Sequence, residues 1–134
     1  MSRTNSNIVT EGIRIQAAAQ FMPAESDPDR GRFIFVYRIR ITNQGTETVQ
    51  LLTRDWVIID ANGRRETVHG DGVVGKQPIL SPGETFEYTS YCPMRTEWGT
   101  MEGHFTFVDI EGRTFKAGVG RFYMATTTEN VILS

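Results

Sequence analysis

FIFVYRIRI, residues 33–41, carries an aromatic or aliphatic side chain at every second position. Successive side chains of a β-strand point to opposite faces, so one face of this stretch is apolar and the other carries Arg38 and Arg40. Residues 13–21, IRIQAAAQF, repeat the alternation. We predict two strands of a sheet that has one face against a hydrophobic core and one face in water.

Five more stretches are typical of strands and are separated by turn signals. Asn62-Gly63 is a strong hairpin signal, because a type I′ turn requires positive φ at both central residues. Ser81-Pro82-Gly83 and Glu111-Gly112 mark further turns. The five predicted strands are residues 49–60, 64–69, 85–92, 101–110 and 114–124.

Seven strands without a convincing helix predict an all-β fold, an antiparallel immunoglobulin or fibronectin type III-like β-sandwich. Trp56 lies on a central predicted strand and suits the core. The facing of residues 49–60 stays ambiguous, because their apolar side chains are adjacent rather than alternating. A closed barrel has the same periodicity and remains the alternative architecture.

The chain has the length of one domain, since its 134 residues are close to the roughly 150 of a typical domain. The hydrophobic fraction of 39% is ordinary for a globular protein, so a core without a disulfide or metal is feasible. We predict a single domain over residues 1–134 with its core at about residues 11–124. Residues 1–10 and 125–134 are expected to be tails, in which residues 131–133 could add a short edge strand.

Charge and composition argue against several classes of protein. Fourteen Lys and Arg against sixteen Asp and Glu give a net charge of −2, whereas proteins that bind duplex nucleic acid carry a basic excess. The longest apolar run, residues 33–37, is far shorter than the about 20 residues of a membrane-spanning helix. The first residues lack the apolar core of a secretion signal, and the single Cys92 cannot form an internal disulfide. We expect a cytoplasmic protein that binds no nucleic acid and does not insert into a membrane.

A glycine-rich stretch, GDGVVG at residues 70–75, matches the GxGxxG pattern of dinucleotide-binding folds. In those folds a helix follows the glycines, but Pro78 and Pro82 follow here, which argues against a dinucleotide-binding fold. Consecutive backbone amides can still form an anion-binding nest, and a lysine adjoins them. The candidate phosphate-binding residues are Gly70, Gly72, Gly75 and Lys76. Tight turns between two sheets are the alternative role of these glycines.

No pattern of residues predicts a metal centre or a catalytic group. His69, His104 and Cys92 lack the short spacings of zinc ligands. No serine lies in a nucleophile elbow, and Cys92 before Pro93 suits a small apolar filler near a strand end. We therefore expect a noncatalytic protein without a metal or a cofactor.

Aromatic residues are more numerous than one face of a core needs. Those in question are Phe33, Phe35, Tyr37, Tyr91, Trp98, Phe122 and Tyr123. Aromatic side chains are enriched at protein interfaces, so we expect some of these to be exposed. Tyr91 and Trp98 are the candidate partner-binding residues. The expected partner is an unknown protein or a second copy of the chain in a homodimer.

Residues 56–93, WVIIDANGRRETVHGDGVVGKQPILSPGETFEYTSYCP, carry several distinctive motifs. They are a tryptophan strand, a D-x-NG turn, a G-x-GVVG-x-QP loop and an L-x-PGE-x-F-x-YTS-x-CP stretch. With these motifs the chain resembles the ApaG (DUF525) family from about Glu11 to Tyr123. The resemblance implies a fibronectin type III-like sandwich that recognises partners, as in eukaryotic proteins that join it to an F-box. Trp98 departs from the small residues that many relatives have there.

The resemblance also implies a setting for the function. Bacterial members are associated by name with cobalt and magnesium efflux and with diadenosine tetraphosphate hydrolase genes. The leading hypothesis is a noncatalytic module for protein–protein interaction. The alternative is a sensor of pyrophosphate or a nucleotide that uses the GxGxxG loop. The residues that match the family's two long motifs are Gly70, Gly72, Val73, Val74, Gly75, Gln77, Pro78, Pro82, Gly83, Glu84, Phe86, Tyr88, Thr89, Ser90, Cys92 and Pro93.

Overall fold

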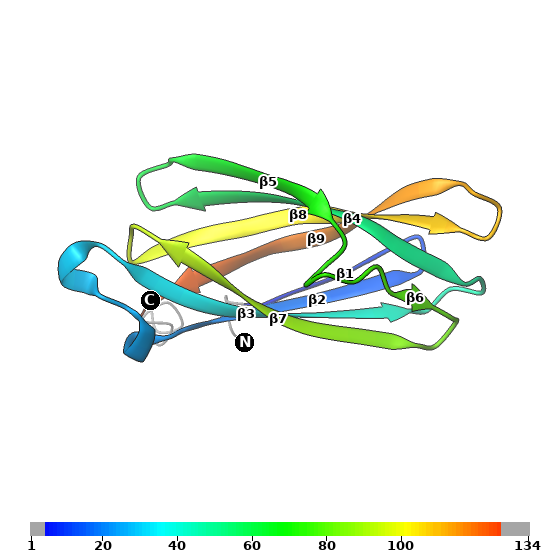
Figure 1. The fold of residues 1–134 in the computed structure, drawn as a ribbon, viewed down its shortest axis with the longest axis horizontal. Helices are drawn as coiled ribbons and strands as arrows, with labels where there is room; N and C mark the ends of the chain where they lie inside the picture. Colours follow the sequence, from blue (N-terminus) through cyan, green and yellow to red (C-terminus); the bar gives the residue numbers. More distant parts are fainter. Residues whose placement is uncertain (1–4, 127–134) are drawn as a thin grey trace.

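The computed structural model describes residues 5–126 as a sandwich of two antiparallel β-sheets (Figure 1). The first sheet has the strand order β1 (Asn5–Thr10), β2 (Ile13–Phe21), β3 (Phe33–Asn43) and β7 (Thr85–Met94). The second has the order β5 (Arg65–Asp71), β4 (Val49–Asp60), β8 (Trp98–Asp109) and β9 (Thr114–Ala125), and the two-residue strand β6 (Ile79–Leu80) also pairs with β4. Two single-turn 3-10 helices, η1 (Pro23–Glu25) and η2 (Pro28–Arg30), lie between β2 and β3. The β-sandwich predicted from the sequence is confirmed.

All seven strands expected from the sequence are present, and β1 and β6 are additional. Residues 5–10, which we expected to be part of a tail, pair with β2 along their whole length as β1. None of the residues of β1 is buried, so this strand lies outside the core. Its Ile8 side chain packs on β9 at Gly118 and Gly120, where an added Cβ would lie 3.1 and 3.3 Å from it. Residues 131–133 lie outside the described residues.

Strand β3 shows the alternation that its sequence predicts. Phe35 and Ile39 are fully buried, whereas Arg38 and Arg40 point to solvent. Trp56 is 3% exposed and packs edge-on against Phe105 of the neighbouring strand, with ring centroids 5.6 Å apart. Aliphatic and aromatic side chains from both sheets therefore form one continuous core.

Most of the aromatic residues that we considered for the surface lie in the core instead. Phe33, Phe35, Tyr37 and Phe122 are buried, whereas Tyr91 and Trp98 are exposed, so the expectation that some of these aromatic residues lie at the surface holds for Tyr91 and Trp98. The physical reason for the burial of the other four is that two sheets share one core: rings from opposite sheets pack together, as do Tyr37 and Phe122, with ring centroids 6.2 Å apart.

A β-bulge explains why the facing of residues 49–60 was ambiguous. The register between β4 and β8 shifts between Leu51 and Thr53. Because side chains alternate with a period of two, one extra residue moves the inward-facing positions from odd to even numbers. Leu51 and Trp56 are therefore both buried although their spacing is odd.

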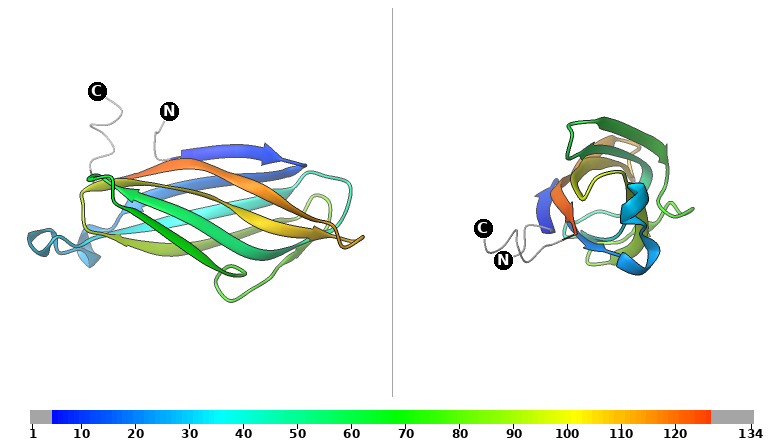
Figure 2. Two further views of the ribbon diagram at one scale, coloured as in Figure 1. Left: turned by 90° about the horizontal axis from the view of Figure 1, so that it is seen from above. Right: turned by 90° about the vertical axis from the view of Figure 1, so that its left-hand side faces the viewer.

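Strands β5 and β7 are the ends of the second and the first sheet, respectively. The strands follow the long axis of the molecule, and the two sheets twist around the core (Figure 2). Residues 5–126 contain no α-helix, and therefore none that is able to cross a membrane.

Candidate functional site

The predicted phosphate-binding loop is a tight turn between β5 and β6. Val73 and Lys76 exchange two backbone hydrogen bonds of 2.8 and 2.9 Å, and the Gly72 amide donates to the Leu52 carbonyl at 2.8 Å. Val74 and Gly75 form the two central positions, with φ of 44° and 78°. The amides of Gly72, Val73 and Lys76 thus already have partners within the protein.

The side chain of Arg54 of β4 forms hydrogen bonds with the backbone at the start of this turn. Its Nη1 donates hydrogen bonds to the carbonyl oxygens of Asp71 and Gly72 at 2.8 and 2.9 Å. A Cβ at Gly70 would overlap the Arg54 guanidinium, so glycine leaves the room that the arginine needs. The structure places Gly70, Gly72, Gly75 and Lys76 in one segment, with Lys76 exposed.

The two predicted partner-binding aromatics are exposed, but they belong to different sheets. Tyr91 lies on β7 with 62% exposure, and Trp98 begins β8 with 46% exposure. Tyr91 lines a hollow of about 450 Å³ with Ile34 and Pro93. The structure therefore connects Tyr91 with a hollow and places Trp98 outside it.

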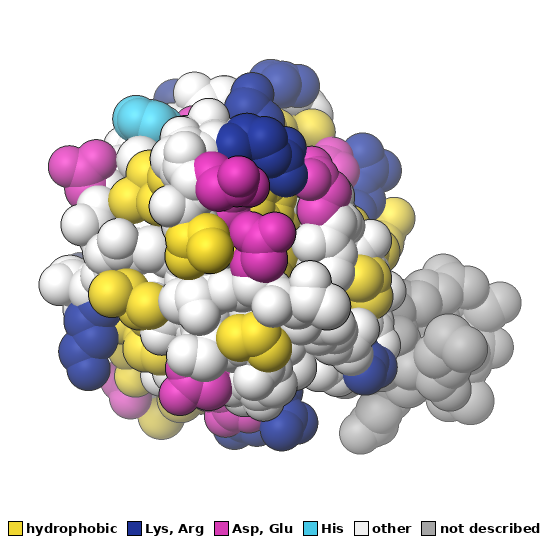
Figure 3. Space-filling model, turned by 90° about the vertical axis from the view of Figure 1, so that its right-hand side faces the viewer, with side chains coloured by type: hydrophobic (Ala, Val, Ile, Leu, Met, Phe, Trp, Pro, Cys, Tyr) yellow, Lys and Arg dark blue, Asp and Glu magenta, His cyan; other side chains and the backbone are white. Residues whose placement is uncertain are grey.

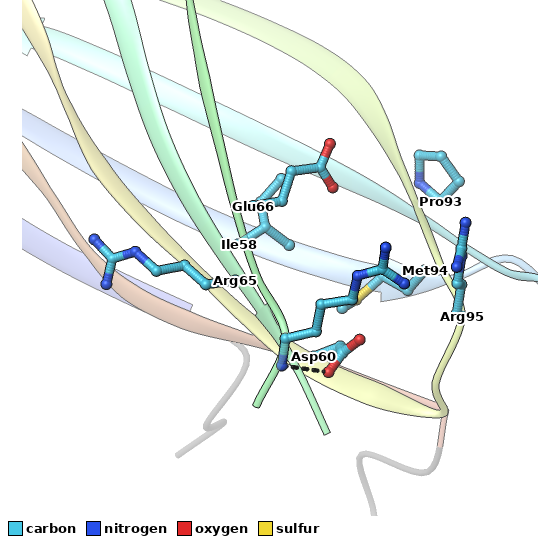
Figure 4. Close-up of a pocket in the computed structure, with 8 residues that line it drawn as sticks. Ile58, Asp60, Arg65, Glu66, Pro93, Met94 and Arg95 are labelled. Atoms are coloured by element: carbon cyan, nitrogen blue, oxygen red, sulfur yellow. Dashed lines mark hydrogen bonds between the residues drawn. The ribbon is translucent and has the colours of Figure 1, made fainter. Parts of the chain in front are cut away.

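Three hollows at one end of the sandwich share Pro93, and we call their combined lining the Pro93 surface. The hollow of Tyr91 is lined by Glu25, Arg32, Ile34, Tyr91 and Pro93. A second hollow, of about 550 Å³, is lined by Asp27, Arg30, Gly31, Arg32, Pro93, Met94 and Arg95. The third, of about 330 Å³, lies between β5 and β7 and is lined by Ile58, Asp60, Arg64, Arg65, Glu66, Pro93, Met94 and Arg95 (Figure 4).

Arginine dominates the charge of the second and third hollows. They contain five arginines (Arg30, Arg32, Arg64, Arg65 and Arg95) against three carboxylates (Asp27, Asp60 and Glu66). Arg30 pairs with Asp27 at 3.5 Å, and Asp60 Oδ1 accepts backbone N–H groups of Asn62 and Arg64. Among the described residues the other four arginines form no ion pair. Sequence reasoning missed this surface, because its arginines come from three separate segments.

A second polar cluster crosses three strands of the second sheet. Asp55 lies opposite His69 of β5 and His104 of β8. Its Oδ1 is 2.7 Å from His69 Nδ1, and its Oδ2 is 3.3 Å from His104 Nε2. Both histidines are thus held by one carboxylate, a pairing between distant residues that their sequence spacing did not reveal.

Carboxylates gather at the end of the molecule that carries the β8–β9 hairpin. Glu47, Asp109 and Glu111 have oxygen atoms within 4.8 Å of one another, and hard divalent cations prefer such oxygen ligands. Figure 3 shows this end, with acidic side chains beside basic ones. Asp109 is engaged by Arg113, whose Nε lies 3.5 Å from it, and its Oδ1 accepts two backbone amides.

Burial raises the pKa of a thiol and of two phenol groups in this protein. Desolvation raises the pKa of the Cys92 thiol to about 11, with a smaller contribution from the charge of Glu66. Burial likewise raises the pKa of Tyr88 and Tyr37. Cys92 is buried, as expected for an apolar filler, and as a neutral thiol it is a poor nucleophile.

Two packed antiparallel sheets with the strand orders β1-β2-β3-β7 and β5-β4-β8-β9 define the chain as a small all-β domain of the fibronectin type III-like class, and the Pro93 surface lies at one end of it. The model of the ApaG domain family, DUF525, matches residues 23–109. The chain belongs to this family, as the resemblance of its motifs implied.

Close relatives cover nearly the whole chain. Protein ApaG of Anaeromyxobacter dehalogenans strain 2CP-C is 50% identical over 117 residues, which are 87% of this chain and 92% of the relative. Protein ApaG of Bradyrhizobium diazoefficiens is 44% identical and covers 94% of this chain and 97% of its own length. A crystal structure of a Bordetella pertussis protein described as ApaA superposes with a TM-score of 0.82 at 39% identity, over 91% of this chain and 96% of that one.

Proposed function

We propose that the chain is a noncatalytic binding module that holds another protein on the Pro93 surface. The observation that carries this proposal is the convergence of three hollows on Pro93. One of them contains Tyr91, an aromatic side chain that is 62% exposed. Tyrosine and arginine are the residue types that most often anchor protein interfaces.

The absence of catalysis is supported by the state of the reactive groups. The raised pKa of Cys92 keeps its thiol protonated and buried at neutral pH. His69 and His104 are held by Asp55 on the strands of a sheet, and the hollows of the Pro93 surface include neither of them. We place the module in the cytoplasm and expect its partner in the setting of cobalt and magnesium efflux that the family resemblance implies.

Site-specific photo-crosslinking tests the proposal directly. A benzophenone amino acid is introduced in place of Tyr91 and, as the control, in place of Lys116, which is exposed on β9 and lines none of the three hollows. Illumination of the native cells should yield a discrete cross-linked protein from position 91 and none from position 116. Equal products from both positions, or none from either, would contradict the proposal.

Recognition of pyrophosphate or a nucleotide at Gly70, Gly72, Gly75 and Lys76 is the competing proposal. It is favoured by the exposed Lys76 beside a turn with two left-handed residues. Calorimetry with pyrophosphate decides it: heat of binding that is lost in Lys76→Ala would support a phosphate site. Heat that is the same in both proteins would refute this site.

A further inference from the structure

We propose that the hollow between β5 and β7 takes an extended acidic segment of the partner, with one apolar side chain seated between carboxylates. This inference rests on the proposed function and specifies the chemistry of its partner. It combines three features of the third hollow: guanidinium groups that form no ion pair among residues 5–126, apolar side chains in its lining, and the two sheet edges that border it.

The Pro93 surface has an excess of positive charge, whereas the whole chain has a net negative charge. The chain carries a net charge of −2, yet the second and third hollows have five arginines against three carboxylates. Arg64 and Arg95 both line the third hollow, from the segments that follow β4 and β7, and neither forms an ion pair among the described residues. Guanidinium groups bind carboxylates through paired hydrogen bonds, so free arginines at a hollow fit an acidic ligand.

The lining of the hollow includes apolar side chains as well as charged ones. Met94 is buried, and Ile58 and Pro93 line the hollow together with the charged residues (Figure 4). A volume of about 330 Å³ accommodates a side chain rather than a folded surface. A ligand with an apolar residue between acidic ones therefore matches the hollow better than a fully ionic ligand such as pyrophosphate.

The position of the hollow favours an extended ligand. β5 ends the second sheet and β7 ends the first, and residues of both line the hollow. An edge strand presents backbone N–H and C=O groups without a partner strand, and an added peptide strand can pair with them. Side chains of such a strand alternate, so the carboxylates two residues before and after the apolar residue point to the same face as that residue.

Fluorescence anisotropy with a labelled peptide tests the inference. The probe is an acetylated and amidated heptapeptide with one leucine between two runs of three glutamates, and a matched peptide has glutamine in place of each glutamate. The double variant Arg64→Ala/Arg95→Ala is compared with Lys116→Ala, which removes a cation outside the hollow. All variants are first checked for an unchanged thermal midpoint.

We expect the glutamate peptide to bind, and its dissociation constant to rise at least about tenfold in the double variant and less than about twofold in Lys116→Ala. Raising NaCl from about 50 mM to about 500 mM should weaken binding, because the charges at the rim are exposed. Equal binding of the glutamine peptide would overturn the acidic inference and leave the proposed function standing. Three other results would also overturn the acidic inference: no binding of either peptide, complete displacement of the peptide by pyrophosphate, or tighter binding of labelled single-stranded DNA.

Discussion

At the scale of single residues, Val74 adopts a conformation that its side chain disfavours. Its φ is 44°, in the left-handed region, and the side chain is 52% exposed. Left-handed backbone costs a residue with a Cβ roughly 1–2 kcal/mol, and a β-branched residue is a rare occupant of a type I′ turn. Replacing the Val74 side chain by that of asparagine should therefore cost the fold little packing.

Val74→Asn should therefore stabilise the protein. Asparagine tolerates positive φ, so we expect the free energy of unfolding to rise by about 0.5–1 kcal/mol and the midpoint by about 2–4 °C. Thermal unfolding followed by circular dichroism measures the change. Val73→Asn is the matched control and should destabilise, since Val73 is 1% exposed. A lower midpoint for Val74→Asn would refute the interpretation of the turn.

Because the Cys92 thiol is buried, we expect the free energy of unfolding to fall at alkaline pH. Burial raises its pKa from 9.0 to about 11, so the unfolded chain releases the thiol proton before the folded protein does. Stability is full below pH 9 and falls as the pH rises toward 11, by roughly 2–3 kcal/mol from this group. The raised pKa of Tyr88 acts in the same direction.

Urea unfolding between pH 8 and pH 10.5 measures this effect in the wild type and in Cys92→Ala. The variant lacks the titrating thiol, so its free energy of unfolding should fall less steeply with pH than that of the wild type. Parallel curves for the two proteins would show that Cys92 does not cause the loss.

At the scale of the elements, the pairing of β4 with β8 depends on Gly103. A Cβ at this position would overlap the carbonyl oxygen of Asp55, which is backbone of the paired strand. Backbone in a central strand cannot move aside without separating the two strands. The glycine is thus required by the close approach of β4 and β8 and not by an unusual φ.

Gly103→Ala should destabilise the protein by roughly 3 kcal/mol or more, because the overlap lies in the middle of the second sheet. Chemical unfolding provides the measurement. Thr106→Ala, on the same strand, serves as the control and should lose about 1 kcal/mol or less. An equal loss in both variants would mean that the contact with Asp55 does not determine the pairing.

The period-two patterns of residues 13–21 and 33–41 were sufficient to predict β2 and β3, because their burial alternates along most of each strand, with the buried Ile34 as the exception in β3. Strand β4 was predictable in extent but not in facing, since the bulge after Leu51 leaves no mark in the sequence. β1 was missed because Ile8 and Val9 are its only apolar residues and none of its side chains is buried.

The candidate site was harder to predict. Tyr91 was selected correctly as exposed, and the GxGxxG segment was located correctly as a turn. The hollow that joins Arg64 to Arg95 could not be predicted, because it exists only where the ends of two sheets meet. The pairing of Asp55 with His69 and His104 likewise depends on strand register.

At the scale of the whole molecule, the two ends of the sandwich differ in charge and shape. Glu47, Asp109 and Glu111 lie close together at the end with the β8–β9 hairpin. Figure 3 shows that acidic side chains lie beside basic ones at this end. The other end has the hollows of the Pro93 surface, where Arg32, Arg64, Arg65 and Arg95 form no ion pair with any residue that the structure describes. This asymmetry gives an approaching partner one electrostatically favoured end and fits a module that binds in a defined orientation.

The most direct test of the proposed binding function uses the partner that cross-linking identifies. This partner is purified on its own, and its affinity is measured for the wild type and for Tyr91→Ala. Tyr91 is exposed, so its truncation should leave the fold intact and weaken binding at least about tenfold, while Lys116→Ala should change the dissociation constant less than about twofold. Unchanged affinity in Tyr91→Ala, measured by calorimetry on folded protein, would contradict the assignment of the Pro93 surface as the binding site.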